Sequence, residues 1–346
     1  MPPILSEYEK LINYEFEDTF KYANTLEDSR AYQIDFNGLK DMVENSSFNT
    51  ISEWQLPWLF DIGIHHYEYS IYAKLHLKDE IFSKKHLSLA ISYASVSLKS
   101  SAQSCGCYEE KNPFITMNKS VFMMSIILLI SKQEEFETIG KYLIDSLNGK
   151  GCIIKRGYPK ATISWFVLKL FSLYSKEEIT LNPLLQPKDV YGYNEILDDW
   201  DTENSFKVEL YLQKLCEYHL VQAQKDDDIY LETKDDPDDL TYRELFLISS
   251  YFLPYEVMVW LKLRERAGLK NPKTFTHPLM NTPIAKMFLN VKEPLPKPTE
   301  LPYAKELLEK LKEKCPDVEV PEWLEENTEK VNEAKSNDII PDDFLK

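Results

Sequence analysis

Glycine is scarce in this chain, with 9 in 346 residues, where an average composition would give about 24. Tight β-hairpin turns depend on glycine because their backbone takes positive φ values. A sheet protein rich in hairpins is therefore disfavoured, and the sequence predicts an all-α protein. Apolar residues form 43 % of the chain, enough for a large core, and the length favours two helical subdomains.

No apolar run is long enough for a transmembrane helix. The strongest one, residues 121–130, falls short of the roughly 20 residues that span a bilayer and predicts a buried core helix instead. Residues 1–7 contain neither a basic nor an apolar signal region, so no signal peptide is expected. We expect a cytoplasmic protein that does not enter a membrane.

Cysteine is also sparse, with five residues scattered apart from Cys105-Gly106-Cys107. An odd number without a disulfide framework indicates reduced thiols in a reducing compartment. The C-x-C spacing differs from the redox C-x-x-C motif, and no second pair completes a zinc site. We expect this segment to be a loop, and no cofactor is predicted.

Basic residues are fewer than acidic ones: the chain has 40 Lys and Arg and 57 Asp and Glu, which gives a formal net charge of −17. Residues 195–244 alone hold sixteen acidic and five basic residues. Nucleic acids and anionic membranes both need cationic surfaces, so neither is an expected partner. Such a charge cluster can steer a basic protein partner, although acidity for solubility alone is the simpler alternative.

Apolar periodicity and turn signals divide the chain into three parts. They are an N-terminal helical domain (1–150), a C-terminal helical domain (151–290) that carries the acidic segment 195–244, and a Pro-rich linker with a charged helical tail (291–346). The helices are expected to form a bundle or an irregular array, without a fixed repeat. The expected helices cover residues 6–20, 27–43, 52–77, 80–100, 113–130, 133–147, 158–173, 189–199, 205–224, 240–251, 255–267, 303–314 and 322–335.

The spacing of Phe206, Leu210, Leu215 and Leu220 predicts the helix at 205–224, and the three aspartates 226–228 are expected to end it. The acidic residues there form two patches, at 198–203 and 226–239. The EF-hand pattern is missing, so calcium is not expected. We interpret the patches as a docking face, with a solvated loop as the alternative. Trp200 suits an interface hot spot or a core anchor. The expected contacts are Asp198, Asp199, Trp200, Asp201, Glu203, Asp226, Asp227, Asp228, Asp235, Asp236, Asp238 and Asp239.

Two groups of residues are candidates for a catalytic site. Asp61, His65 and Glu68 share one face of a predicted helix, and such a set can hold a divalent metal in a helical hydrolase. The zincin motif is absent, and an Asp–His hydrogen bond is the simpler interpretation. Cys216 and His219 lie three residues apart, but a nucleophile and base also need an orienting group and an oxyanion site. No G-x-S-x-G, P-loop or G-x-G-x-x-G motif occurs.

A series of short motifs runs through residues 162–288. They are Trp165-Phe166, Tyr191-Gly192-Tyr193, Trp200-Asp201, Cys216 with His219, Pro254-Tyr255-Glu256-Val257, Leu263-Arg264-Glu265 and His277-Pro278-Leu279-Met280-Asn281-Thr282-Pro283. In this half the chain resembles helical immunity proteins of bacterial polymorphic and type VI toxin systems, including the two-part PoNi-like group that neutralises DNase toxins.

The resemblance implies a noncatalytic protein without a cofactor that binds and neutralises a cognate toxin. Nuclease toxins are often basic because they bind the phosphate backbone of nucleic acid, so an acidic inhibitor would associate with them quickly. A helical adaptor or scaffold for another cellular protein is the third hypothesis. It differs from the first only in its partner.

Overall fold

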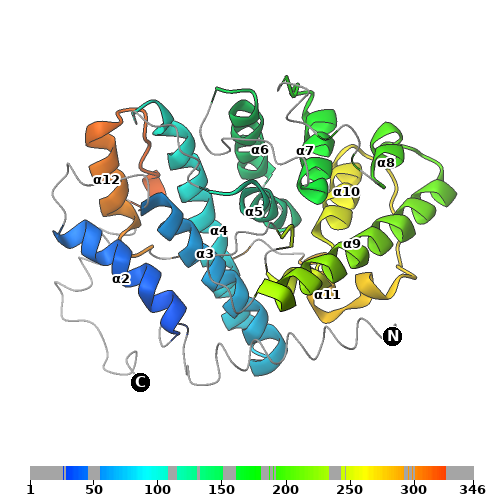
Figure 1. Ribbon diagram of the computed structural model, residues 1–346, viewed down its shortest axis with the longest axis horizontal. Helices are drawn as coiled ribbons and strands as arrows, with labels where there is room; N and C mark the ends of the chain where they lie inside the picture. The colour runs from blue at the N-terminus through cyan, green and yellow to red at the C-terminus, as the bar shows by residue number, and fades with distance from the viewer. Residues whose placement is uncertain are drawn as a thin grey trace.

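The computed structural model describes residues 26, 29–45, 55–107, 115–130, 133–150, 161–180, 187, 190, 192–233, 243–245, 247–291, 295, 298 and 301–324. Within these ranges all regular secondary structure is helical, which confirms the predicted all-α class. Figure 1 shows a multi-helix array with α12 and α2 at one end and α8 and α9 at the other. The helix predicted at 6–20 and most of the one at 322–335 lie outside the described residues.

The helices occur in the order expected from the sequence, and several bounds agree closely with it. The α-helices are α2 (Arg30–Asn45), α3 (Gln55–Tyr72), α4 (Glu80–Gln103), α5 (Met117–Leu129), α6 (Gln133–Leu147), α7 (Thr162–Ser175), α8 (Asn194–Asp198), α9 (Ser205–Thr233), α10 (Tyr255–Arg266), α11 (Pro283–Leu289) and α12 (Ala304–Lys314).

The α3–α4 pair forms the N-terminal half of the array, with α2 packed on α3 and α12 packed on α4. The two helices approach closely at Gly63, where a Cβ atom would lie 2.9 Å from the carbonyl oxygen of Ala90. A π-helical turn, Ala73–Leu77, follows α3 and ends at Lys78 with φ 55°. Asp79 then caps α4 by accepting a hydrogen bond from the backbone N–H of Phe82.

Helix α5 is the central element of the core. Nearly all of its side chains are buried, as expected from the apolar run at 121–130. It packs against α6, α7 and α10, so helices on both sides of the boundary expected near residue 150 share one continuous hydrophobic core. No helix in the described part of the chain combines the length and apolarity that crossing a bilayer would require.

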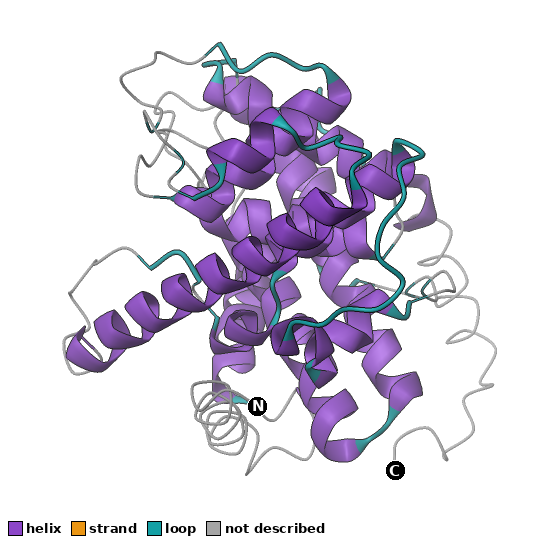
Figure 2. Ribbon diagram, turned by 90° about the vertical axis from the view of Figure 1, so that its right-hand side faces the viewer, coloured by secondary structure: helices purple, strands orange, loops and turns teal. Residues whose placement is uncertain are grey.

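Helix α9 is the longest described helix and runs across the face seen in Figure 2. It continues to Thr233, so the prediction that the aspartates at 226–228 end the helix was wrong. Hydrogen bonds within the helix explain the difference: Gln222 donates to Asp226 and Gln224 donates to Asp228, one turn later in each case. The expected helix at 240–251 is, in its described part, a short 3₁₀ turn at Ile248–Phe252.

Candidate functional site

The predicted contact residues differ widely in exposure. The exposed members are Asp198, Asp201, Glu203 and Asp228, whereas Asp199, Trp200 and Asp227 are half-buried and Asp226 is buried. Asp235, Asp236, Asp238 and Asp239 lie outside the described residues. The first patch, residues 198–203, covers the end of α8 and the turn that leads to α9, and we call it the acidic turn.

The acidic turn is held from inside the protein by the backbone carbonyl of Trp200. That oxygen accepts hydrogen bonds from Trp260 Nε1 (3.0 Å) and Arg264 Nη1 (2.9 Å), both on α10. The side chain of Trp200 packs against the core rather than projecting into solvent. Of the two roles that the sequence left open for Trp200, the structure favours the core anchor.

Arg264 is fully buried and carries a positive charge into the interior. Its guanidinium also donates to Asn271 Oδ1 (3.1 Å) and to the carbonyl of Lys270 (3.1 Å), and it lies over the Trp260 ring. Burial lowers the pKa of Arg264, while the nearby charges of Asp201 and Asp199 act in the opposite direction. Part of the acidity of this turn therefore offsets a buried cation, which is a structural role.

We expect Arg264→Lys to destabilise the fold by about 2 kcal/mol. A single ammonium cannot reproduce the three directed hydrogen bonds of the guanidinium, so buried acceptors lose their donors. Urea denaturation measures the change. Lys262→Ala on the same helix is the matched control, because it removes only an exposed ion pair with Glu265 and should cost less than about 1 kcal/mol. Equal losses for both variants would contradict the anchoring role.

Asp199 is also engaged within the protein. Its carboxylate pairs with Lys207 at 2.8 Å and accepts a hydrogen bond from the Tyr211 hydroxyl at 3.0 Å. The hydrogen bond from Lys207 lowers the pKa of Asp199. Glu195 on α8 pairs in the same way with Lys214 on α9. These two bridges join the α8 region to α9 and leave fewer free carboxylates than the sequence indicates.

Asp226 was predicted to contact a partner, but its side chain points into the protein. It accepts hydrogen bonds from the backbone N–H groups of Glu244 (3.2 Å) and Leu245 (2.7 Å). Only 1 % of the residue is exposed to solvent. Asp226 therefore ties α9 to the backbone of residues 244–245, and its assignment as a contact residue was wrong.

The outward face of α9 provides a surface that the sequence prediction missed. Phe206 (77 % exposed), Leu210 (40 %) and Val221 (53 %) are among the most exposed large apolar side chains of the described residues. Residues that follow Phe206 by 4, 11, 15 and 22 positions lie on nearly the same side of the α-helix as Phe206. The exposed residues that share this side are Phe206, Leu210, Glu217, Val221 and Asp228. We call this row the α9 stripe.

The four apolar residues whose spacing predicted this helix do not share one side of it. Phe206 and Leu210 face solvent, while Leu215 and Leu220 are buried. The buried side also includes Val208, Leu212 and Cys216. Apolar residues occur on both sides of this helix, so periodicity alone did not identify the buried one.

The proposed metal set does not converge on one point. Asp61 pairs with Lys119 on α5 at 2.8 Å, whereas His65 pairs with Asp35 on α2 at 2.8 Å. Among the described residues no group of three or more His, Cys, Asp or Glu side chains is arranged to hold a metal ion. The Asp–His pairing that the sequence suggested as the simpler interpretation occurs, but Asp35 rather than Asp61 is the partner.

Cys216 and His219 are both buried and do not form a working pair. Burial raises the pKa of the Cys216 thiol, which disfavours the nucleophilic thiolate. The ring of His219 is held by Glu256, at 2.9 Å from Nδ1, and by the Ser250 carbonyl, at 3.0 Å from Nε2. Both ring nitrogens are thus engaged away from the thiol, which agrees with two ordinary helical neighbours.

The Cys105–Cys107 segment is a short 3₁₀ turn after α4. Cys105 is disulfide-bonded, so the expectation that all the thiols are reduced was wrong. The other described cysteines, Cys107, Cys216 and Cys315, are free. Cysteine count alone could not reveal a single bridge, because pairing depends on distances that the fold sets.

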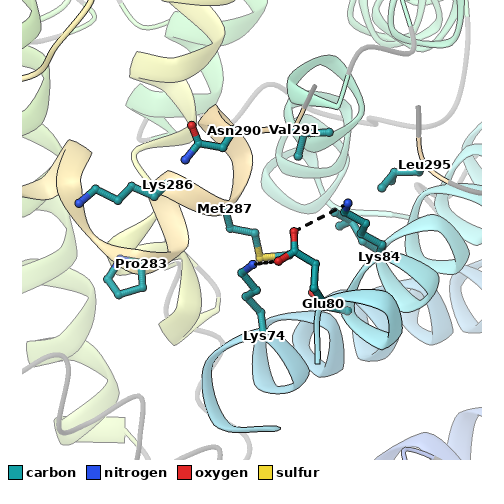
Figure 3. Close-up of a pocket in the computed structure, with 11 residues that line it drawn as sticks. Lys74, Glu80, Lys84, Pro283, Lys286, Met287, Asn290, Val291 and Leu295 are labelled. Atoms are coloured by element: carbon teal, nitrogen blue, oxygen red, sulfur yellow. Dashed lines mark hydrogen bonds and ion pairs between the residues drawn. The ribbon is translucent and has the colours of Figure 1, made fainter. Parts of the chain in front are cut away.

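Two cavities of about 490 and 510 Å³ flank α11, and lysine lines both of them in this acidic protein. The first lies between the start of α4 and α11 and contains Lys74, Lys84 and Lys286. Its one carboxylate, Glu80, sits between Lys74 (2.6 Å) and Lys84 (3.7 Å), as Figure 3 shows. The hydrogen bond from Lys74 lowers the pKa of Glu80.

Comparisons of the chain with protein families, curated proteins and solved structures do not assign a function to these sites. No protein-family model matches the chain, and neither do any curated proteins or solved structures.

Proposed function

We propose that the protein is a noncatalytic immunity protein that binds and neutralises a basic bacterial toxin. The toxin would dock on the acidic turn and the α9 stripe. The kind of partner is inferred from the short motifs in residues 162–288 that resemble those of helical immunity proteins, and the docking site is inferred from the surface of α9. As an inhibitor of a toxin that acts inside the cell, the protein would work in the cytoplasm.

The observation that carries the proposal is the pairing of exposed apolar and acidic side chains along one row. Stable interfaces combine a buried apolar centre with a polar rim, and Phe206 and Leu210 offer such a centre. Glu203 lies three residues before Phe206, and Glu217, which also contacts His277 Nε2 at 3.2 Å, and Asp228 follow farther along the helix and add negative charge to the row. Lysine and arginine on a nuclease toxin would be attracted by these carboxylates, while its apolar side chains would cover the row.

The buried groups around the acidic turn make the test more specific. Changes at Asp199, Asp201 or Asp226 would disturb Lys207, Arg264 or the backbone of residues 244–245, so a loss of binding there would be ambiguous. Glu203 and Phe206 are exposed and have no such role in the described structure, and Asp228 is exposed with a hydrogen bond only from Gln224 on the same helix. Substitutions at these three positions therefore report on docking.

Association with the natural partner should respond differently to charge and to apolar variants. The partner is first recovered by co-purification from the source cell and identified, and its binding is then followed by surface plasmon resonance. Glu203→Lys with Asp228→Lys should lower the association rate about tenfold at low salt and weaken its salt dependence, because steering is lost. Phe206→Ser should mainly raise the dissociation rate.

Ile81→Ser is the matched control, since Ile81 is 84 % exposed but lies on α4. It should bind like the unmodified protein and protect cells equally well. Unchanged kinetics for both α9 variants would refute the docking face. Recovery of a cellular protein that is not a toxin would instead support the adaptor hypothesis.

A further inference from the structure

Two free cysteines from distant parts of the chain meet at the C-terminal end of α4. Cys107 lies in the 3₁₀ turn that follows this helix, and Cys315 is the C-cap residue of α12. Helix α12 packs on α4, and both lie toward the same end of the array in Figure 1. Four residues after Cys315, the backbone N–H of Glu319 donates to Gln103 Oε1 at 3.2 Å. The end of α12 is thus held beside the end of α4.

The thiols of Cys107 and Cys315 form a hydrogen bond with each other, so the two side chains are direct neighbours. A disulfide bond needs sulfur atoms about 2.05 Å apart and Cβ atoms about 3.8 Å apart. Thiols that are already in contact need only a small movement to reach this geometry. The fold therefore places a pair of free thiols where a disulfide bond can form between α12 and the end of α4.

The two thiols differ in access and in acidity. Cys107 is half-buried, whereas Cys315 has no exposed surface. Burial raises the pKa of Cys315 to about 12, and the hydrogen bond with Cys107 acts in the same direction. A reagent in solution therefore reacts first with Cys107, because the thiolate is the nucleophile and Cys315 is both covered and protonated.

We propose that Cys107 and Cys315 form a redox-modification site, which a small-molecule disulfide such as oxidised glutathione converts into an intramolecular disulfide bond. The bond would fasten α12 covalently to the end of α4, where hydrogen bonds and packing hold it in the reduced protein. In a reducing compartment such bonds are transient and sense oxidation. The site would thus make the attachment of α12 depend on the redox state of the cell.

The reaction balances as two exchange steps. The Cys107 thiolate attacks one sulfur of oxidised glutathione, the glutathione S–S bond breaks, and one glutathione thiolate leaves. The Cys315 thiol then loses its proton and attacks the Cys107 sulfur, which releases the second glutathione. Two cysteine thiols become one disulfide, and one glutathione disulfide becomes two thiols. The second step should speed up as pH rises, because the pKa of Cys315 is high.

Peptide mapping tests the pairing. The full-length protein is incubated with oxidised glutathione at mildly alkaline pH, alkylated, and digested with trypsin without reduction. Trypsin cleaves after lysine, so Cys107 and Cys315 fall in peptides 100–111 and 315–330. Mass spectrometry should find these peptides joined, at least about tenfold more often than either is joined to the peptide with Cys216, because proximity favours the intramolecular exchange.

The variant Cys107→Ser should abolish the joined peptides, and Cys216→Ala is the control. Cys216 is completely buried, and no cysteine is among the groups that shift its pKa, so its removal should leave the bond unchanged. Circular dichroism checks that both variants are folded. Joined peptides that persist in Cys107→Ser would show that Cys105 is used instead and would overturn the proposal. A glutathione adduct on Cys107 without joined peptides would also overturn it.

Limited proteolysis tests the effect of the bond on α12. Oxidation should slow cleavage within Ala304–Lys314 by about tenfold, because a bridged helix opens less often. The Cys107→Ser variant should be cleaved at the same rate with and without oxidised glutathione. Equal cleavage rates for the reduced and bridged forms of the unmodified protein would contradict the fastening of α12.

Discussion

Glu256→Ala should destabilise the protein by about 3–5 kcal/mol, the cost typical of breaking a buried charged or hydrogen-bonded pair. Glu256 and His219 are both completely buried, and the carboxylate oxygens lie 2.9 and 3.1 Å from His219 Nδ1. Truncation would remove the only described partner of that nitrogen and leave a cavity beside it. Chemical denaturation monitored by circular dichroism measures the loss.

Glu256→Gln separates hydrogen bonding from charge in this pair. His219 Nε2 faces a carbonyl oxygen, which can only accept, so Nε2 carries a proton. Nδ1 then either donates to an ionised Glu256 or accepts from a protonated one. The amide introduced by Glu256→Gln could donate to Nδ1 of a neutral ring, so we expect this variant to lose about 1 kcal/mol. A loss as large as that of Glu256→Ala would show that the imidazolium–carboxylate form is required.

The regular parts of the fold could be predicted from the sequence because they depend on local patterns. The bounds of α6 agree with the prediction, and residues 121–129 of the apolar run form the buried part of α5. The side of α9 that faces the core could not be predicted in the same way. Phe206 and Leu210 continue an apolar spacing on one side while Val208 and Leu212 continue another, and only the helices packed against α9 decide between them.

The candidate site was predictable in location but not in detail. The concentration of charge at 195–244 identified the region of α8 and α9. The buried roles of Asp226 and Arg264 depend on partners that the fold brings together, such as the backbone N–H of Leu245 and the carbonyl of Trp200. The lysine-lined cavity depends on packing between α4 and α11, which lie far apart in the sequence. No local pattern encodes such pairings.

Glu244 is expected to make stability depend on pH near neutrality. It accepts hydrogen bonds from the N–H groups of Ile163 and Ser164 at the start of α7 and from the Thr162 hydroxyl. These donors favour its ionised form, yet burial outweighs them and raises the pKa of Glu244 to about 8. The unfolded chain would ionise this group near its ordinary pKa of 4.5, so protein stability should fall as pH rises from about 4.5 to 8.

The loss from this group amounts to up to about 5 kcal/mol across that range, at about 1.4 kcal/mol per pKa unit. Glu244→Gln should remove it, because an amide keeps one accepting oxygen for the two N–H groups and can donate to Thr162 in place of the acid proton. The variant should match the unmodified protein near pH 5 and exceed its stability at pH 8. Urea denaturation at several pH values measures both curves, and the histidines contribute equally to each. A constant difference between the curves from pH 5 to pH 8 would mean that Glu244 is ionised throughout, with the N-terminus of α7 stabilising its charge.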